Sequence, residues 1–174
     1  MDEKAESAYT AYVAERWRDL VRAAVFLGAG AHEAEDVAQQ TLVRCYADWT
    51  RVSGADNRDA YVYRMLLNCL RDVRRTRWWR GRIDHDPAAP DSPVSAVADA
   101  TEALAVADAV HRALDGLTKP NREVVVLRYF VQLTEAQTAA VLGIAPGTVK
   151  SRLSRSLARL ATDQHLLDLS GRTP

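Results

Sequence analysis

The segment from Arg82 to Val97 constrains the fold of this 174-residue chain more than any other feature of its sequence. It holds Pro87, Pro90 and Pro93 among Ala, Asp and Ser, and it has almost no bulky apolar side chain. Because such a segment buries too little apolar surface to offset its loss of chain entropy, it predicts a flexible linker. We therefore expect two small modules at residues 5–81 and 100–163, a linker at 82–99 and a tail at 164–174.

Both modules have the apolar periodicity of amphipathic helices, and neither has a β-branched run that alternates with polar residues. In the clearest pattern, apolar residues recur every three or four positions: Val62, Met65, Leu66, Cys69, Leu70 and Val73. We predict helices over residues 7–27, 32–49, 58–80, 104–117, 121–130, 135–142 and 146–160, with a loop at 53–57. The expected fold class is therefore all-α, with two small helical domains.

The opposite face of the 58–80 helix is basic and carries one amide and one aromatic side chain. It consists of Arg64, Asn68, Arg71, Arg75 and Trp78. Such a face offers cations for phosphates, an aromatic plane for stacking and an amide for base edges, as binding to single-stranded nucleic acid requires. The alternative is a solvated face on which Trp78 or Trp79 packs back against the core.

The second module carries the spacing of a helix-turn-helix. Thr134 and Gln137 have the spacing of a capping box, and the short helix that they begin ends at Gly143. Pro146 then stands where a proline is accepted in the first turn of the next helix. Ala139 is small where the two helices would cross. A helix, a tight glycine turn and a second helix form the DNA-binding helix-turn-helix plan.

The 146–160 helix separates into an apolar and a basic side. The expected apolar stripe is Val149, Leu153, Leu157 and Leu160. The opposite side and its flanks carry Lys150, Ser151, Arg152, Ser154, Arg155 and Arg159. Outward Arg and Ser side chains can reach base edges in a major groove, and flanking cations suit phosphates. A solvated helix face is the alternative, but such a face normally includes acidic residues and this helix has none.

The net charge at first argues against a nucleic-acid partner, because 23 Lys plus Arg balance 23 Asp plus Glu. The charges are, however, segregated along the chain. Residues 71–82 hold six arginines against one aspartate, and residues 150–159 hold basic residues without an acid. The balancing acids lie in residues 1–50 and 83–100. A neutral total is therefore compatible with two basic faces.

The sequence lacks the signatures of the common enzyme classes. It has no glycine-rich phosphate loop, no Gly-x-Ser-x-Gly turn and no His/Glu cluster with zinc spacing, so we expect no catalysis, metal or cofactor. Cys45 and Cys69 lie far apart, which excludes a disulfide-rich scaffold and fits a reducing cytosol. No stretch approaches the ~18 apolar residues of a membrane span, and the acidic N-terminus lacks a signal-peptide pattern. The expected location is the cytoplasm.

Four segments together resemble one known family, the bacterial sigma factors of the small two-domain extracytoplasmic-function group. The run LTEAQTAAVLGIAPGTVKSRLSR at Leu133–Arg155 resembles their region 4.2, and Arg122–Phe130 resembles region 4.1. In the first module, Ala34–Thr41 resembles region 2.2, and Ala60–Asn68 with the arginines that follow resembles regions 2.3 and 2.4. The resemblance covers most of the chain in the order of the family, linker included.

The resemblance implies that the first module is sigma domain 2, which binds the clamp helices of the largest polymerase subunit and opens the −10 promoter element. The implied polymerase-facing residues are Asp36, Gln39, Gln40 and Arg44, where Gln40 replaces a common glutamate. The implied −10 residues are Arg64, Asn68, Arg71, Arg74, Arg75 and Trp78. The loop Val52–Asn57 matches the segment that captures a flipped base.

The resemblance implies equally that the second module is sigma domain 4, which contacts the polymerase flap and reads the −35 element. The implied −35 residues are Lys150, Ser151, Arg152, Ser154, Arg155 and Arg159. Thr138 departs from the commoner aliphatic residue in this module. Core RNA polymerase and promoter DNA are thus the expected partners, and an anti-sigma factor is a further candidate. The alternative function is a stand-alone helix-turn-helix regulator, which would footprint duplex DNA without polymerase.

Overall fold

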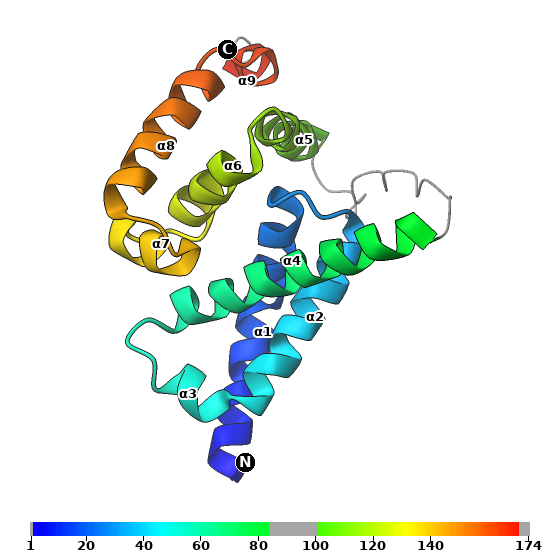
Figure 1. Ribbon diagram of the computed structural model, residues 1–174, viewed down its shortest axis with the longest axis vertical. Coiled ribbons are helices and arrows are strands. Elements are labelled where there is room, and N and C mark those ends of the chain that lie inside the picture. The colour runs from blue at the N-terminus through cyan, green and yellow to red at the C-terminus, as the bar shows by residue number, and fades with distance from the viewer. Residues whose placement is uncertain (1, 84–100, 171–174) are drawn as a thin grey trace. The chain divides into compact units, whose positions relative to one another are not determined.

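The computed structural model describes residues 2–83 and 101–170, and their side chains at 2–76 and 106–167. All regular elements in these residues are helical, as predicted, and the chain divides into two compact units (Figure 1). The first unit is built from α1 to α4, and the second from α5 to α9. The predicted linker lies outside the described residues except for positions 82 and 83, which still belong to α4.

The first unit consists of α1 (Glu3–Phe26), α2 (Ala31–Ala47), α3 (Trp49–Ser53) and α4 (Arg58–Ile83). Its centre is the contact between α2 and α4. Val62, Leu66, Cys69 and Leu70 of the predicted stripe are buried there, whereas Met65 and Val73 are half-buried. The buried surface of α4 is wider than predicted, because Tyr63 and Leu67 are buried as well.

The predicted helix over 32–49 is in fact two helices, which meet at Asp48 (φ −109°, ψ 24°). The break turns the indole of Trp49 inward, where it packs edge-on against Tyr9 with 5.3 Å between ring centroids. The ring of Tyr12 lies 5.6 Å from the same indole. The apolar pattern continues through the break, so periodicity alone did not reveal α3.

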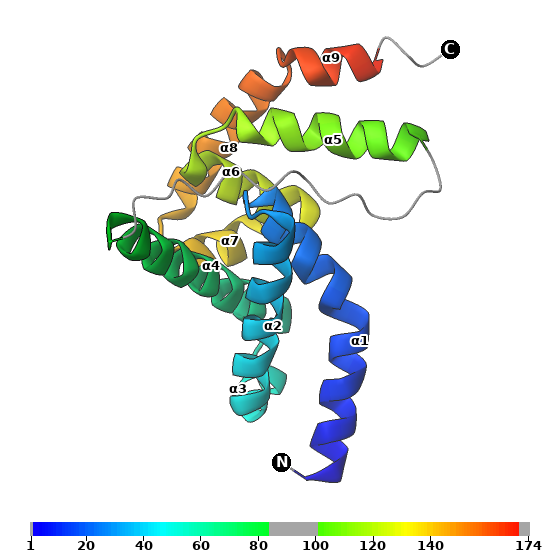
Figure 2. The same cartoon turned by 90° about the vertical axis from the view of Figure 1, so that its right-hand side faces the viewer.

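The second unit consists of α5 (Thr101–Asp115), α6 (Lys119–Val125), a π-helical turn η1 (Val126–Phe130), α7 (Glu135–Leu142), α8 (Pro146–Leu160) and α9 (Gln164–Ser170). α8 packs against α6 and α7, and α9 packs along α5 (Figure 2). α9 lies in the segment that the sequence left as a tail, and Leu166 is half-buried in it. The tail thus forms part of this unit.

The predicted helix over 121–130 also changes character within its length. From Val126 onward it is π-helical, since the backbone N–H of Val131 donates to the carbonyl of Val126 at 3.1 Å. The turn ends at Gln132, a non-glycine residue at φ +62°. The guanidinium of Arg128 donates to the carbonyl oxygen of Leu133 and so helps to hold this bend.

The helix-turn-helix forms as predicted. The hydroxyl of Thr134 accepts from the backbone N–H of Gln137 at 3.2 Å, and the Gln137 amide oxygen accepts from the N–H of Thr134 at 2.8 Å. Gly143 ends α7 at φ +66°, a left-handed conformation that glycine adopts without steric cost. A small core of Val124, Ala139 and Val149 then holds α8 against α6 and α7, with Leu142, Ile144 and Leu153 packed around it.

The predicted apolar stripe of α8 is wrong at Leu157. This side chain is 38% exposed, whereas Ser156 is fully buried and its hydroxyl donates to the carbonyl oxygen of Arg152 at 2.7 Å. At 100° per residue, position 156 lies about 20° from Val149 around the helix axis and position 157 about 80° away. The inward direction therefore falls on the serine, and Leu157 lies at its border.

Both cysteines are buried free thiols, and the burial of Cys69 agrees with its place in the predicted apolar stripe. Burial, with smaller contributions from the nearby Cys69 and Asp48, raises the pKa of the Cys45 thiol from 9.0 to about 12. Because the folded-state pKa lies above the unfolded value, protonated Cys45 contributes its full stability below about pH 9. That contribution is lost as the pH rises towards 12.

We therefore expect the free energy of unfolding to fall between about pH 9 and 12, in part through Cys45. Urea unfolding monitored by circular dichroism over this range measures the effect. A Cys45→Ala variant should show a shallower dependence, because it removes one group that ionises on unfolding. If both proteins had the same pH slope, the thiol would not be buried as described. A thiol reagent at pH 7 should label neither cysteine until the chain unfolds.

Candidate nucleic-acid and protein interfaces

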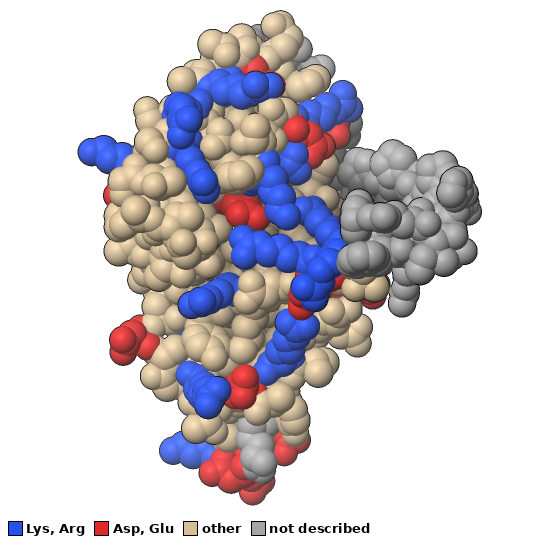
Figure 3. Space-filling model, viewed as in Figure 1, with Lys and Arg blue, Asp and Glu red and all other residues tan. Residues whose placement is uncertain are grey.

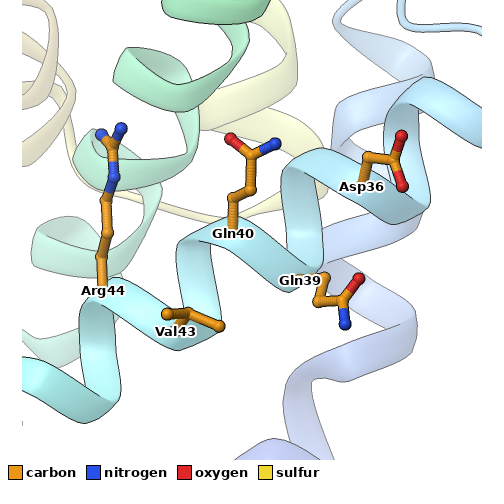
Figure 4. A pocket seen from close by; sticks show the side chains of 5 residues that line it. All are labelled: Asp36, Gln39, Gln40, Val43 and Arg44. Carbon is orange, nitrogen blue, oxygen red and sulfur yellow. The ribbon is translucent and has the colours of Figure 1, made fainter.

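The outward face of α2 brings together the four residues that the sequence assigned to polymerase. Asp36, Gln39, Gln40 and Arg44 are all exposed, and together with Val43 they line an open groove of about 360 Å³ (Figure 4). Gln40 and Arg44 point to the same side of the helix, while Gln39 points to another. The buried face of α2 consists of Ala34, Val37, Ala38, Thr41, Leu42 and Cys45.

Val43 is a residue that sequence reasoning missed at this face. It is 62% exposed, although it is aliphatic, and it lies between the polar side chains that line the groove. An aliphatic side chain within a polar rim is the usual composition of a protein-binding surface. The signal was present in the sequence, because position 43 is one turn from Gln39 and Gln40 on the exposed side.

The outward face of α4 confirms a continuous basic stripe but does not contain every predicted residue. Arg64, Asn68, Arg71 and Arg75 are exposed and follow one another at helical spacing. Arg74 is half-buried and lies on the flank. The side chain of Trp78 lies outside the described residues. Figure 3 shows basic side chains over α4 and over α8, with few acidic side chains among them.

One acidic residue connects the α2 and α4 faces. The Asp72 carboxylate accepts from Arg44 of α2 at 3.3 Å and from Arg75 of α4 at 3.2 Å. All three side chains are substantially exposed, at 47%, 43% and 73% for Arg44, Asp72 and Arg75, so the ion pairs add little to stability. Their effect is to orient two guanidinium groups that belong to different candidate surfaces.

The predicted base-capturing loop lies between α3 and α4 and is short. Gly54 donates its backbone N–H to the carbonyl oxygen of Thr50 at 3.2 Å, which closes α3. At the other end, the Asn57 side-chain oxygen accepts from the N–H of Ala60 at 2.7 Å and so caps α4. Val52, which the sequence placed in the loop, is instead a buried residue of α3. The loop between the two helices is therefore Gly54–Asn57, in which Gly54 and Asp56 are exposed and Ala55 and Asn57 are half-buried.

The outward face of α8 carries the six residues assigned to the −35 element. Lys150, Ser151, Ser154, Arg155 and Arg159 are exposed, and Arg152 is half-buried. The hydroxyl of Ser151 donates to the carbonyl of Thr148 at 3.1 Å, and Nε of Arg155 donates to the carbonyl of Ser151 at 3.2 Å. Both contacts lie within α8, and they hold these two side chains along the exposed face.

Arg159 differs from the other five residues in its position on α8. It lies in the last turn, about 12 Å along the helix axis from Ser151 at 1.5 Å per residue. Its Nη2 atom lies 3.8 Å from the point where a β-carbon at Gly116 would be. Residues near the N-terminus of a recognition helix contact base edges in the helix-turn-helix geometry. Arg159 therefore lies farther from the N-terminal turns of α8 than the other five residues.

A helix-turn-helix with a basic recognition helix, in one chain with a helical unit that carries a second basic face, is the plan of a transcription protein with two candidate DNA-binding faces. Residues 107–160 match the family model of sigma-70, region 4. The chain is 37% identical over 161 residues to the RNA polymerase sigma-E factor of Streptomyces coelicolor, which covers 92% of this chain and 88% of the relative. It is 35% identical over 149 residues to the ECF RNA polymerase sigma factor SigM of Mycobacterium tuberculosis, covering 83% and 70%.

The chain belongs to the RNA polymerase sigma factors of the extracytoplasmic-function type. The fold agrees with this assignment. The sigma factor RpoE of Bartonella quintana, solved in complex with the anti-sigma factor NepR, superposes with a TM-score of 0.77 at 23% identity. That match covers 96% of this chain and 99% of RpoE. CnrH, solved with the cytosolic domain of CnrY, gives 0.65 at 26% identity over 94% and 89%.

The comparisons favour the sigma factor over the stand-alone regulator, because the matching relatives extend across both units and not only across the helix-turn-helix. Within the described residues, no helix is long and apolar enough to cross a membrane. The same part of the chain contains no group of three or more His, Cys, Asp or Glu side chains that could hold a metal ion.

Proposed function

We propose that this sigma factor uses three helix faces in three separate contacts. The exposed face of α2 binds core RNA polymerase at the clamp helices, the basic stripe of α4 holds the opened −10 strand, and the outward face of α8 reads the −35 element. The division of residues 5–81 and 100–163 into sigma domains 2 and 4 is part of this proposal. Contact with the polymerase flap is assigned to the second domain.

The observation that carries the proposal is the composition of the exposed face of α8. The helix Pro146–Leu160 contains no acidic residue, and its outward side chains are cationic or hydroxyl-bearing. Phosphate oxygens attract the cations, while Arg and Ser can bond to base edges. The capping box at Thr134 and the left-handed turn at Gly143 provide the helix, tight turn and helix order of a helix-turn-helix.

The zero net charge supports the proposal that this chain binds DNA as a subunit of the polymerase holoenzyme and not alone. Phosphate contacts supply most of the non-specific affinity of a protein for DNA, and they need a surplus of cations. This chain has 23 basic and 23 acidic residues, so it has no surplus of positive charge, although it carries two basic faces. We therefore propose that polymerase supplies much of the grip on DNA and that the sigma factor supplies the sequence preference.

Two further assignments rest on the relatives. The similar solved structures are complexes of sigma factors with NepR and CnrY, and NepR is an anti-sigma factor. We accordingly include an anti-sigma factor among the partners of this chain. Transcription by bacterial polymerase takes place in the cytoplasm, and we place the protein there without a catalytic role of its own.

Run-off transcription with reconstituted holoenzyme on a library of genomic promoter fragments tests the proposal. We expect transcripts that depend on this chain and that share two spaced promoter elements. The purified chain alone should give no specific footprint on duplex DNA. A specific footprint without polymerase, together with no transcripts from an active core, would establish the regulator instead.

An Asn68→Ala variant should slow open-complex formation about ten-fold while leaving duplex binding near the wild-type level, because the exposed amide offers hydrogen bonds to the edge of an opened base. Permanganate reactivity of the melted thymines measures the effect. Thr76→Ala is the matched control on the same helix, since Thr76 is exposed but lies away from the basic stripe. Wild-type permanganate reactivity in the Asn68 variant would refute this role.

A further inference from the structure

Arg58, the first residue of α4, occupies an unusual position for a cation. The first turn of a helix carries the positive end of the helix dipole, so a guanidinium there is electrostatically unfavourable. The Arg58 side chain turns back over two aromatic rings. Its Cζ lies 5.6 Å from the centre of the Tyr12 ring and 5.5 Å from that of Trp49. Both distances fall within the range of cation–π attraction.

The rings beneath Arg58 form a layer that joins three helices. Trp49 and Tyr12 are only 4% and 5% exposed. Tyr9 packs edge-on against Trp49 at 5.3 Å and against Tyr46 at 5.1 Å, and its hydroxyl donates to the carbonyl of Leu42 at 2.9 Å. Because α1, α2 and α3 each supply rings to this layer, a side chain that stacks on it is fixed relative to all three.

The Gly54–Asn57 loop lies between the two partners of this stack. Trp49 begins α3 on one side of the loop, and Arg58 follows Asn57 on the other side. The contact between Trp49 and Arg58 therefore closes the loop at its base. A separate tie exists in the same turn, where Asp59 pairs with Arg16 of α1 at 3.3 Å. This ion pair holds the start of α4 to α1 and involves no contact with the Arg58 guanidinium, although both of its charges act on the Tyr12 hydroxyl.

We propose that Arg58 is a positioning residue that fixes the Gly54–Asn57 loop and thereby the base that this loop selects in the opened −10 strand. The inference rests on the proposed function of the first unit. Arginine suits the task because its planar guanidinium stacks on aromatic faces, whereas the compact lysine ammonium does not stack in this way. Loss of the stack should widen the set of loop conformations and so relax the choice of base.

The first test measures the loop itself in the full-length protein without polymerase. Amide hydrogen exchange at positions 54–57 should become about three-fold to ten-fold faster in Arg58→Ala and less so in Arg58→Lys. Asp59→Asn is the matched control, because it removes the ion pair with Arg16 and leaves the stack on Trp49. Equal acceleration of these amides in Asp59→Asn and Arg58→Ala would show a general loosening of α4, and would overturn the inference.

The second test measures base selection in the reconstituted holoenzyme. On promoters with a randomised −10 element, Arg58→Ala should reduce the preference at the captured position about three-fold to ten-fold, with the −35 preferences unchanged. Arg58→Lys should show a smaller reduction. An unchanged −10 preference in an active Arg58→Ala holoenzyme would overturn the inference. If the wild-type holoenzyme made no transcripts, the proposed function would be wrong, and so would the role of the loop in base selection. The hydrogen-exchange result would still show whether Arg58 fixes the loop.

Discussion

Replacement of Arg155 by alanine should cost on the order of 1–3 kcal/mol in recognition of the −35 element, provided that its guanidinium makes a bidentate contact with a base edge. Arg155 is exposed near the middle of α8, on the side away from the Val149 core. Among the described residues, its side chain donates one hydrogen bond, from Nε to the carbonyl oxygen of Ser151 at 3.2 Å. Breaking this exposed hydrogen bond to form a base contact costs little free energy. The alanine variant should therefore lose most of the free energy that the base contact contributes.

Transcription from promoters with each base substituted in the −35 element distinguishes the ways in which Arg155 could act. A base contact predicts that Arg155→Ala loses preference at one position and that Arg155→Lys restores charge without restoring preference. Arg159→Ala serves as the control, because Arg159 lies in the last turn beside Gly116. An equal loss on every −35 sequence, with a salt dependence reduced by about one phosphate contact, would make Arg155 a phosphate ligand.

The longer helices could be predicted from sequence because their apolar periodicity is strong, whereas the short α3 and α9 were not predicted as separate helices. The apolar stripe around Leu66 and the capping box at Thr134 are local sequence patterns, and the structure contains both as predicted. The break at Asp48 and the π-helical turn at Val126 were missed for the opposite reason. In both places the sequence keeps a helical pattern, and the change in geometry follows from packing or bonding with residues outside that pattern.

For the candidate site, the sequence predicted which residues lie on exposed helix faces but not which residues contact one another across helices. Spacing placed Asn68 and Arg155 on exposed faces, where the structure has them. It did not show that Arg44 and Arg75 share Asp72, or that Arg58 stacks on Trp49. Such contacts join helices that are distant in sequence, and periodicity describes only one helix at a time.

The largest effect on folding is expected from Leu66→Ala. Leu66 is fully buried on α4, the helix that packs against α2, and the loss of its side chain would leave a cavity in the core of the first unit. Substitutions of this kind cost about 2–5 kcal/mol, a large share of the roughly 5–15 kcal/mol that stabilises a typical domain. Urea unfolding followed by circular dichroism should show this loss directly, as a lower midpoint with an unchanged slope.

Val43→Ala is the matched substitution on the other side of the same helix pair. Val43 is 62% exposed, so its truncation should change the free energy of unfolding by no more than about 0.5 kcal/mol. If the groove on α2 binds polymerase, the same truncation should nevertheless weaken association with the core enzyme, because it removes the aliphatic centre of the surface. Titration of labelled sigma factor with core polymerase measures that association.

The two variants together separate folding from binding. Leu66→Ala should lower polymerase affinity only to the extent that the first unit is unfolded, so a stabilising osmolyte should restore it. Val43→Ala should lower affinity in a fully folded protein, and an osmolyte should not correct the loss. If Val43→Ala bound polymerase as tightly as the wild type, the α2 groove would not be the interface. Asp36, Gln39, Gln40 and Arg44 would then form an ordinary solvated helix face, because they line the same groove.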